Sequence, residues 1–189
     1  MKKIVVILGI AICFLGMTFE IKACKPARIP FREWLSYYNS EEYMVVEGYF
    51  LPATEGNYAT KLRVTRSSHS SIKVGQEYEV FEYGPFGNMC EKYEMRGYIH
   101  KDLVGKKHKR LLIAYTKRSV NGKLVTPIFW KEGVAVSNNK IIEREYEYDR
   151  VLEKEVLYEY LISLNKVWKQ VLGGDTKKLE WKRKKIKVI

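Results

Sequence analysis

Three cysteines are the residues of this chain best suited to covalent chemistry. Cys13 lies inside an apolar N-terminal stretch, Cys24 follows that stretch, and Cys90 stands alone further along the chain. In an oxidising compartment, the pair that remains once the apolar stretch is removed predicts a disulfide between Cys24 and Cys90. The alternative is two unrelated thiols, with Cys24 lipidated and Cys90 buried. A disulfide would consume Cys90 as a nucleophile, which speaks against cysteine catalysis.

The remaining chemistry-bearing residues do not form a catalytic pattern. The chain has 3 histidines, and none is spaced with a second histidine, a cysteine or a carboxylate as metal ligands require. The serines around His69 lack a Gly-x-Ser-x-Gly motif and a nearby acid to orient the histidine. A glycine-rich phosphate loop is also missing. We therefore expect no enzyme, no metal site and no cofactor.

Positive charge is the stronger signal for binding. The chain has 34 Lys and Arg against 22 Asp and Glu, a net charge of +12. Two clusters are candidate polyanion sites: Lys106, Lys107, Lys109 and Arg110 in a connection, and Lys182, Arg183, Lys184 and Lys185 near the C-terminus. The expected partner is an anionic glycan or lipid surface, or an envelope or extracellular protein. Specific binding of nucleic acid is not expected of an exported chain, and the alternative is a basic surface that only keeps the protein soluble.

The N-terminus has the form of a secretory signal. Lys2 and Lys3 precede an uncharged run from Ile4 to Phe19, and Ala23 supplies a small residue before Cys24. We predict a signal peptide over residues 1–23 and an exported protein that is periplasmic, attached to the cell surface or secreted. The alternative is an uncleaved N-terminal anchor. Membrane association of the exported protein is expected only if Cys24 is lipidated.

Residues 24–140 show mostly the pattern of β-structure, and 46 % hydrophobic residues can build a core. Phe31, Trp34, Leu35 and Tyr38 share one face of a short predicted helix. Gly48, inside the run Tyr43–Leu51, predicts a bulge or sharp bend. Further predicted strands are Tyr58–Arg66, Tyr78–Tyr83, Arg110–Lys117, Leu124–Trp130 and Val134–Ser137, and a turn at Asn121-Gly122 pairs Arg110–Lys117 with Leu124–Trp130.

Residues 141–189 predict a different kind of structure. From Asp149 onward, apolar residues recur every three to four positions, at Leu152, Val156, Tyr160, Leu164, Val167 and Val171. This spacing predicts an amphipathic helix of about six turns. Gly173 and Gly174 would end it, and a basic tail follows.

These elements together predict a mainly β fold with a C-terminal helix. The specific expectation is a five-stranded, closed barrel of the OB type over residues 24–140, followed by the helix and basic tail over residues 141–189. A β-sandwich is the alternative.

The order of short motifs resembles the netrin-like modules related to tissue inhibitors of metalloproteinases. The motifs are Ala23-Cys24 with Pro26, Val45-Val46-Glu47-Gly48, Gly75-Gln76-Glu77-Tyr78-Glu79-Val80, Cys90, Gly97 and Leu111-Leu112-Ile113-Ala114-Tyr115. They extend over about two-thirds of the residues after Ala23. The resemblance implies a closed OB barrel. It also implies that the amine and carbonyl of an N-terminal Cys24 chelate the zinc of a metalloprotease.

The chain departs from that family in its cysteines. The inhibitors begin Cys-x-Cys, whereas Lys25-Pro26 follows Cys24, and no further cysteines occur near residues 128–140. The expected function is therefore an exported, non-catalytic binding module of the cell envelope. The alternatives are an envelope lipoprotein tethered through Cys24 with a structural role, and a metalloprotease inhibitor that uses the N-terminal Cys24.

Overall fold

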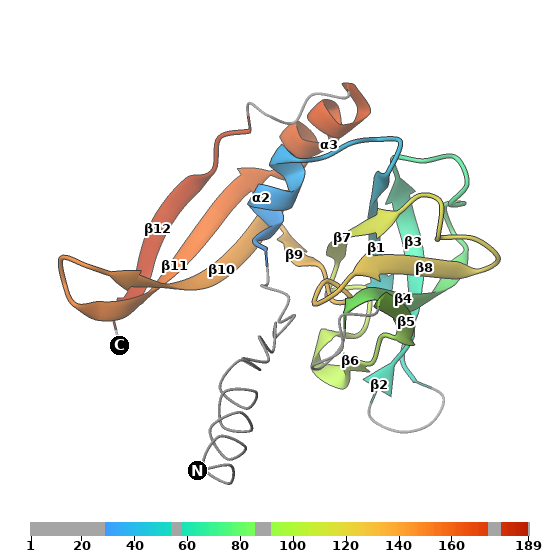
Figure 1. The fold of residues 1–189 in the computed structure, drawn as a ribbon, viewed down its shortest axis with the longest axis horizontal. Helices are drawn as coiled ribbons and strands as arrows, with labels where there is room; N and C mark the ends of the chain where they lie inside the picture. The colour runs from blue at the N-terminus through green and yellow to red at the C-terminus, as the bar shows by residue number, and fades with distance from the viewer. Residues whose placement is uncertain (1–28, 54–57, 86–91, 174–178, 189) are drawn as a thin grey trace, which may run out of the picture.

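The computed structural model describes residues 29–53, 58–85, 92–173 and 179–188, which form a mainly β fold (Figure 1). Its helices are α2 (Phe31–Ser36), the 3-10 helix η1 (Lys101–Leu103) and α3 (Leu164–Gly173). Its strands are β1 (Tyr43–Phe50), β2 (Tyr58–Ala59), β3 (Lys61–Ser67), β4 (Glu77–Pro85), β5 (Lys92–Arg96), β6 (Ile99–His100), β7 (Arg110–Tyr115), β8 (Lys123–Pro127), β9 (Val134–Ser137), β10 (Lys140–Asp149), β11 (Lys154–Ser163) and β12 (Lys182–Val188). Residues 1–23, Cys24 and Cys90 lie outside the described residues, so cleavage, lipidation and the disulfide stay predictions.

Ten strands form one large open sheet, and no closed barrel is found in the described residues. The order is β12-β11-β10-β9-β7-β1-β3-β4-β5, with antiparallel pairs, and β8 pairs in parallel with β4. The predicted closure therefore does not occur. A closed barrel would need β8 to pair with the free edge of β7. Strand β9 already pairs with that edge of β7 at Arg110 and Leu111.

The turn at Asn121-Gly122 lies where the sequence predicts it, with a positive φ at both residues. It joins β7 to β8, and the two strands lie close together. Their predicted pairing as a hairpin is wrong, because the ladder of β8 is formed with β4. Leu124, for example, lies opposite Val80.

β1 and β7 lie at the centre of the sheet and are buried on both faces. One core contains Phe31 and Leu35 of α2, Val45 of β1, Leu111 and Ile113 of β7, and Trp168 of α3. The other contains Met44, Val46 and Phe50 of β1, Leu112 and Ala114 of β7, and residues of β3, β4 and β8. Strands covered on both faces do not alternate between apolar and polar residues, which explains the continuous apolar run in β7.

Two local predictions from the first strands are confirmed. The short helix is α2, and its buried residues are Phe31 and Leu35. The ladder between β1 and β3 shifts register between Glu47 and Gly48, which is the predicted bulge. A Cβ atom at position 48 would lie 2.4 Å from the carbonyl oxygen of Arg63, so glycine allows the two backbones to approach closely here.

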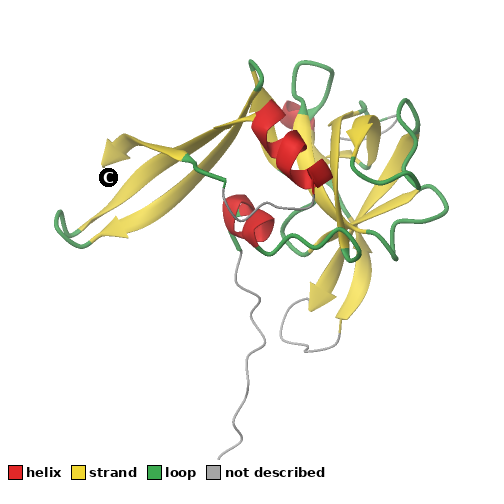
Figure 2. Cartoon of the chain, turned by 90° about the horizontal axis from the view of Figure 1, so that it is seen from above, coloured by secondary structure: helices red, strands yellow, loops and turns green. Residues whose placement is uncertain are grey.

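Strands β10, β11 and β12, which we call the arm, project away from the rest of the sheet (Figures 1 and 2). β10 starts beside β9 after a tight turn at Asn138-Asn139, where both residues have a positive φ. It then continues past β9 and pairs with β11 along its whole length, from Lys140 to Asp149. Helices α2 and α3 lie at the base of the arm (Figure 1).

The predicted helix from Asp149 is wrong over its first half. Lys154–Ser163 is strand β11, and only Leu164–Gly173 is helical. Val156 and Tyr160 are four residues apart, a spacing that places residues on one face of both a helix and a strand. Tyr158 and Ile162 are buried along with them, so the true period of β11 is two.

Candidate binding surfaces

The predicted basic tail forms the outer edge of the arm. Lys182, Arg183, Lys184 and Lys185 all lie in β12, and every residue of this strand is exposed. With Lys187, five of its seven residues are basic. One edge of β12 pairs with β11, and the other has no partner strand among the described residues. The strand therefore presents a row of positive charge to solvent.

On one face of the arm, the charge of Arg183 is balanced internally. Arg183 donates to the carboxylate of Glu147 at 2.7 Å, and its guanidinium lies 3.6 Å from the centre of the Tyr158 ring. Tyr160 donates its hydroxyl proton to the same carboxylate. Burial, followed by this hydrogen bond, raises the pKa of Tyr160 to about 12, so the phenol stays neutral at physiological pH. On this face, Tyr158 packs against Arg183, and Tyr160 and Arg183 both donate hydrogen bonds to Glu147.

The other face leaves its lysines unopposed by acid at two places. The register sets Lys182 opposite Leu161 and Lys187 opposite Leu157, whereas Lys184 stands opposite Glu159. Glu159 also pairs with Arg144 of β10 at 3.0 Å. On this face, Lys182 and Lys187 are therefore the positions at which a negative ligand meets no competing carboxylate directly across the strand, and on the opposite face Lys185 stands across from Tyr158.

Glu143 fastens α2 to the base of the arm. Its carboxylate accepts hydrogen bonds from the backbone N–H groups of Phe31 at 2.5 Å and Arg32 at 3.3 Å. Arg32 also pairs with Glu145 at 2.7 Å, and its guanidinium lies 3.8 Å from the centre of the Tyr160 ring. Burial raises the pKa of Glu143 even though the two N–H groups and Arg32 oppose the shift.

The second predicted cluster is divided by the structure. Lys109 pairs with the buried carboxylate of Glu47 at 3.2 Å, and the indole N–H of Trp168 donates to the same carboxylate at 3.2 Å. Arg110 donates to the carbonyl oxygens of Glu132 and Gly133 at 2.7 and 3.0 Å and so holds the turn before β9. Lys109 and Arg110 are therefore engaged within the protein, although Lys109 is exposed like Lys106 and Lys107.

The two predicted clusters do not come together. Lys106 to Arg110 lead into β7, and β7 is four strand positions away from β12 in the sheet. At the usual strand spacing this is about 19 Å. They are two separate basic areas, and β12 is the larger.

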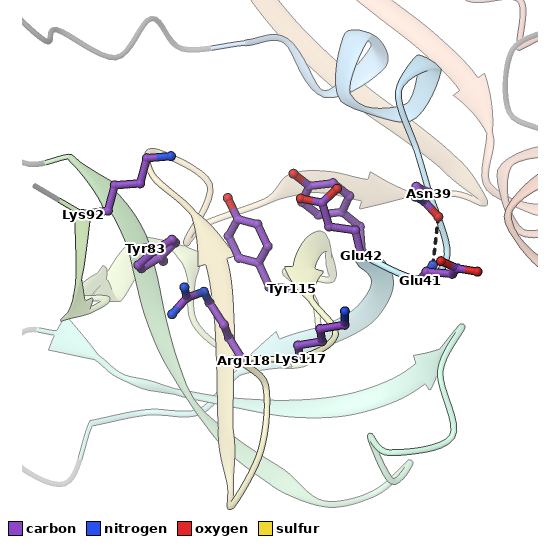
Figure 3. Close-up of a pocket in the computed structure, with 9 residues that line it drawn as sticks. Asn39, Glu41, Glu42, Tyr83, Lys92, Tyr115, Lys117 and Arg118 are labelled. Atoms are coloured by element: carbon purple, nitrogen blue, oxygen red, sulfur yellow. Dashed lines mark hydrogen bonds between the residues drawn. The ribbon is translucent and has the colours of Figure 1, made fainter. Parts of the chain in front are cut away.

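A surface cleft that the sequence does not predict lies at the other end of β7. It measures about 750 Å³ and is lined by Asn39, Glu41, Glu42, Tyr43, Tyr83, Lys92, Tyr115, Lys117 and Arg118. Figure 3 shows Tyr115 in the middle, with Lys92 and Arg118 on the side of Tyr83 and with Glu41 and Asn39 on the other side. These residues come from separate segments, and the pairing of Tyr43 with Tyr115 depends on strand register. No spacing in the sequence could have indicated it.

The cleft offers hydrogen bonds and both signs of charge. Burial is the largest cause that raises the pKa of Tyr43 and of Tyr115, so both phenols remain neutral. Arg118 lies 3.5 Å from the centre of the Tyr83 ring and 3.7 Å from the carboxylate of Glu94, which fixes its position. The lining residues include no Ser, Cys or His, and no group of three metal-ligating side chains occurs within the described ranges.

Two further findings concern membrane-spanning helices and similarity to known proteins. Within residues 29–53, 58–85, 92–173 and 179–188, no helix is both long and apolar enough to cross a bilayer. Comparisons of the chain with family models, with curated proteins and with solved structures found no match.

Proposed function

We propose that this protein is an exported, non-catalytic binding module that holds an anionic ligand on β12. The observation that carries the proposal is the outer strand of the arm, which is exposed throughout and has five basic residues out of seven. Exposed cations that are not neutralised by neighbouring acids attract polyanions over several ångströms, and the attraction weakens as salt is added. Lys182 and Lys187 meet this condition on the face away from Arg183, because leucines stand opposite them.

A charge reversal tests the proposal. The Lys182→Glu/Lys187→Glu variant should bind heparin about tenfold more weakly than the unchanged protein at low salt, and its affinity should depend less on salt. Both sites are exposed and have leucines across the strand, so the fold should tolerate the change. Affinity is measured by titration over a series of salt concentrations.

Two matched variants separate β12 from bulk charge. Lys61→Glu/Lys73→Glu makes the same charge change at exposed positions of the body and should weaken binding only slightly. Lys106→Glu/Lys107→Glu examines the other predicted cluster. Equal losses in all three variants would mean that only net charge matters, and a loss confined to Lys106 and Lys107 would place the ligand on the connection instead; either result would overturn the proposal.

Kinship with netrin-like modules remains part of the proposal, and the strand order supports it. β1, β3, β4 and β8 follow one another, β7 lies on the other side of β1, and β8 is parallel to β4. An OB barrel places its five strands in this relation and is itself partly open.

The alternatives depend on Cys24, which lies outside the described residues. A lipoprotein requires a diacylglyceryl group on Cys24, and a metalloprotease inhibitor requires a free amine there, which an acyl group would abolish. Mass spectrometry of the N-terminal peptide of the exported protein distinguishes the two forms, and polyanion binding at β12 is compatible with either.

A further inference from the structure

The far end of the arm exposes apolar side chains in the turn between β10 and β11. Val151 is 92 % exposed and Leu152 is 40 % exposed. Both lie between the last residue of β10 and the first of β11, so they form the tip of a hairpin. Exposure of aliphatic side chains to water is unfavourable, so apolar residues at an exposed tip are typical of a contact with another apolar surface.

The strands beside the tip expose more apolar surface. Tyr146 and Tyr148 of β10 are 59 % and 63 % exposed, and they share one face because they are two residues apart. Ile186 and Val188 of β12 are also exposed. Val188 pairs with Val156, which is only two positions after the first residue of β11, so the end of β12 lies next to the hairpin tip. Six of the fourteen large apolar side chains exposed in the described residues gather at this end.

Positive charge flanks the same end of the arm. Lys185 and Lys187 alternate with Ile186 and Val188 in the last part of β12, and Arg150 and Lys154 stand on either side of the turn. Asp149, Glu153 and Glu155 outnumber these two basic residues beside the turn, so the positive charge at this end comes from β12. Each kind of side chain suits one layer of an anionic membrane surface. Aliphatic residues at the tip suit the apolar layer, tyrosines suit the interface, and lysines suit the anionic headgroups.

We propose that the far end of the arm inserts into the headgroup layer of an anionic lipid bilayer. This inference rests on the proposed function, and it names lipid headgroups as the anionic ligand of β12. A soluble polyanion would account for the lysines alone, whereas a bilayer takes up the aliphatic tip as well. The membrane contact is made by Val151, Leu152 and β12, and it does not require an acyl group on Cys24.

The Val151→Ser/Leu152→Ser variant separates the apolar contribution from the charge. With vesicles of phosphatidylglycerol and phosphatidylcholine in equal amounts, it should sediment with about tenfold lower affinity than the unchanged protein. Its affinity for heparin should stay the same, because β12 is unaltered. The matched control Val74→Ser/Val120→Ser removes two other exposed valines and should leave binding to the vesicles unchanged.

Insertion can also be followed directly in the full chain. Val151→Trp should be quenched by brominated lipids in these vesicles, beyond the quenching of the 4 native tryptophans. All variants are compared with the same N-terminus as the unchanged protein, so a difference between them reports on the tip.

The inference would be overturned by equal vesicle binding of the Val151→Ser/Leu152→Ser variant and the unchanged protein, or by the absence of additional quenching. A second result would also overturn it: the unchanged protein is a dimer in sedimentation velocity and does not bind vesicles, and the Val151→Ser/Leu152→Ser variant is a monomer. In that case a second copy of the chain would cover the tip. If Lys182→Glu/Lys187→Glu retains full heparin affinity while the tip variant still loses vesicle binding, the polyanion proposal fails and membrane insertion stands. If heparin binding falls as expected and vesicles are bound equally by all variants, only the membrane inference fails.

Discussion

At the scale of single residues, the contacts of each basic side chain decide its role. Arg183 and Arg110 are both conspicuous in the sequence, yet Arg183 is neutralised by Glu147, and Arg110 holds the turn before β9. Residue type and clustering indicate where positive charge accumulates. They do not indicate which charges fold back onto the protein, because the acidic partners lie 36 residues away for Arg183 and 62 residues away for Lys109.

Glu143 gives a prediction about pH. Its pKa is raised in the folded protein, so its contribution to stability is complete below the ordinary carboxyl pKa and is lost as the pH rises through the raised value. Glu143→Gln removes this titration. The free energy of unfolding of the unchanged protein minus that of Glu143→Gln should therefore decrease between a pH of about 4 and a pH of about 7.

Urea unfolding across that pH range measures the difference. Glu155→Gln is the control, since it removes an exposed carboxylate from β11 and makes the same change in net charge. A difference that increases with pH would show that the hydrogen bonds from Phe31 and Arg32, and the charge of Arg32, outweigh the cost of burial.

At the scale of elements, the sequence predicts the bulge at Gly48 correctly but takes strand β11 for part of a helix. Gly48 stands out because glycine is unusual inside a run of β-branched and aromatic residues, so its local context alone predicts the bulge. The helix predicted from Asp149 is wrong before Leu164 because Val156, Tyr160 and Leu164 satisfy the helical and the strand spacing together. Only the intervening Tyr158 and Ile162 distinguish the two, and they are apolar enough to suit either pattern.

The bulge at Gly48 gives a prediction about stability. Gly48→Ala would place a Cβ atom 2.4 Å from the carbonyl oxygen of Arg63 and 3.0 Å from Cγ of Leu62. Because a backbone oxygen of a paired strand cannot move aside cheaply, we expect a loss of about 1–3 kcal/mol in the free energy of unfolding. Chemical denaturation measures it. Gly173→Ala, where no atom lies within 4 Å of an added Cβ, should change stability by less than about 1 kcal/mol.

At the scale of the whole molecule, the sequence predicts the class of fold but not the shape of the sheet. Strand content follows from local patterns, whereas the open sheet depends on β9 pairing with β7 and on β8 pairing with β4. These pairings join strands that are far apart in the sequence, so no local pattern of residues indicates them. The cleft beside Tyr115 and the arm follow from the same long-range pairings.

The shared central strands predict that the two cores unfold together. Val45 and Val46 are neighbours in β1, and both are fully buried. Val45 packs in the core beneath α2 and α3, whereas Val46 packs in the core beside β3 and β4. Val45→Ala and Val46→Ala should each lower the free energy of unfolding by about 1–3 kcal/mol. Circular dichroism and tryptophan fluorescence should give coincident urea transitions in both variants. Separate transitions in either variant would show two independent folding units.

The hydrogen bond from Phe31 to Glu143 also constrains the order of events during synthesis. The donor and the acceptor are 112 positions apart, so most of the chain must be made before the first turn of α2 can meet its carboxylate. A helix of six residues is unstable by itself in water. Helix α2 is therefore among the last elements to take its final form, because its partner in β10 leaves the ribosome long after it.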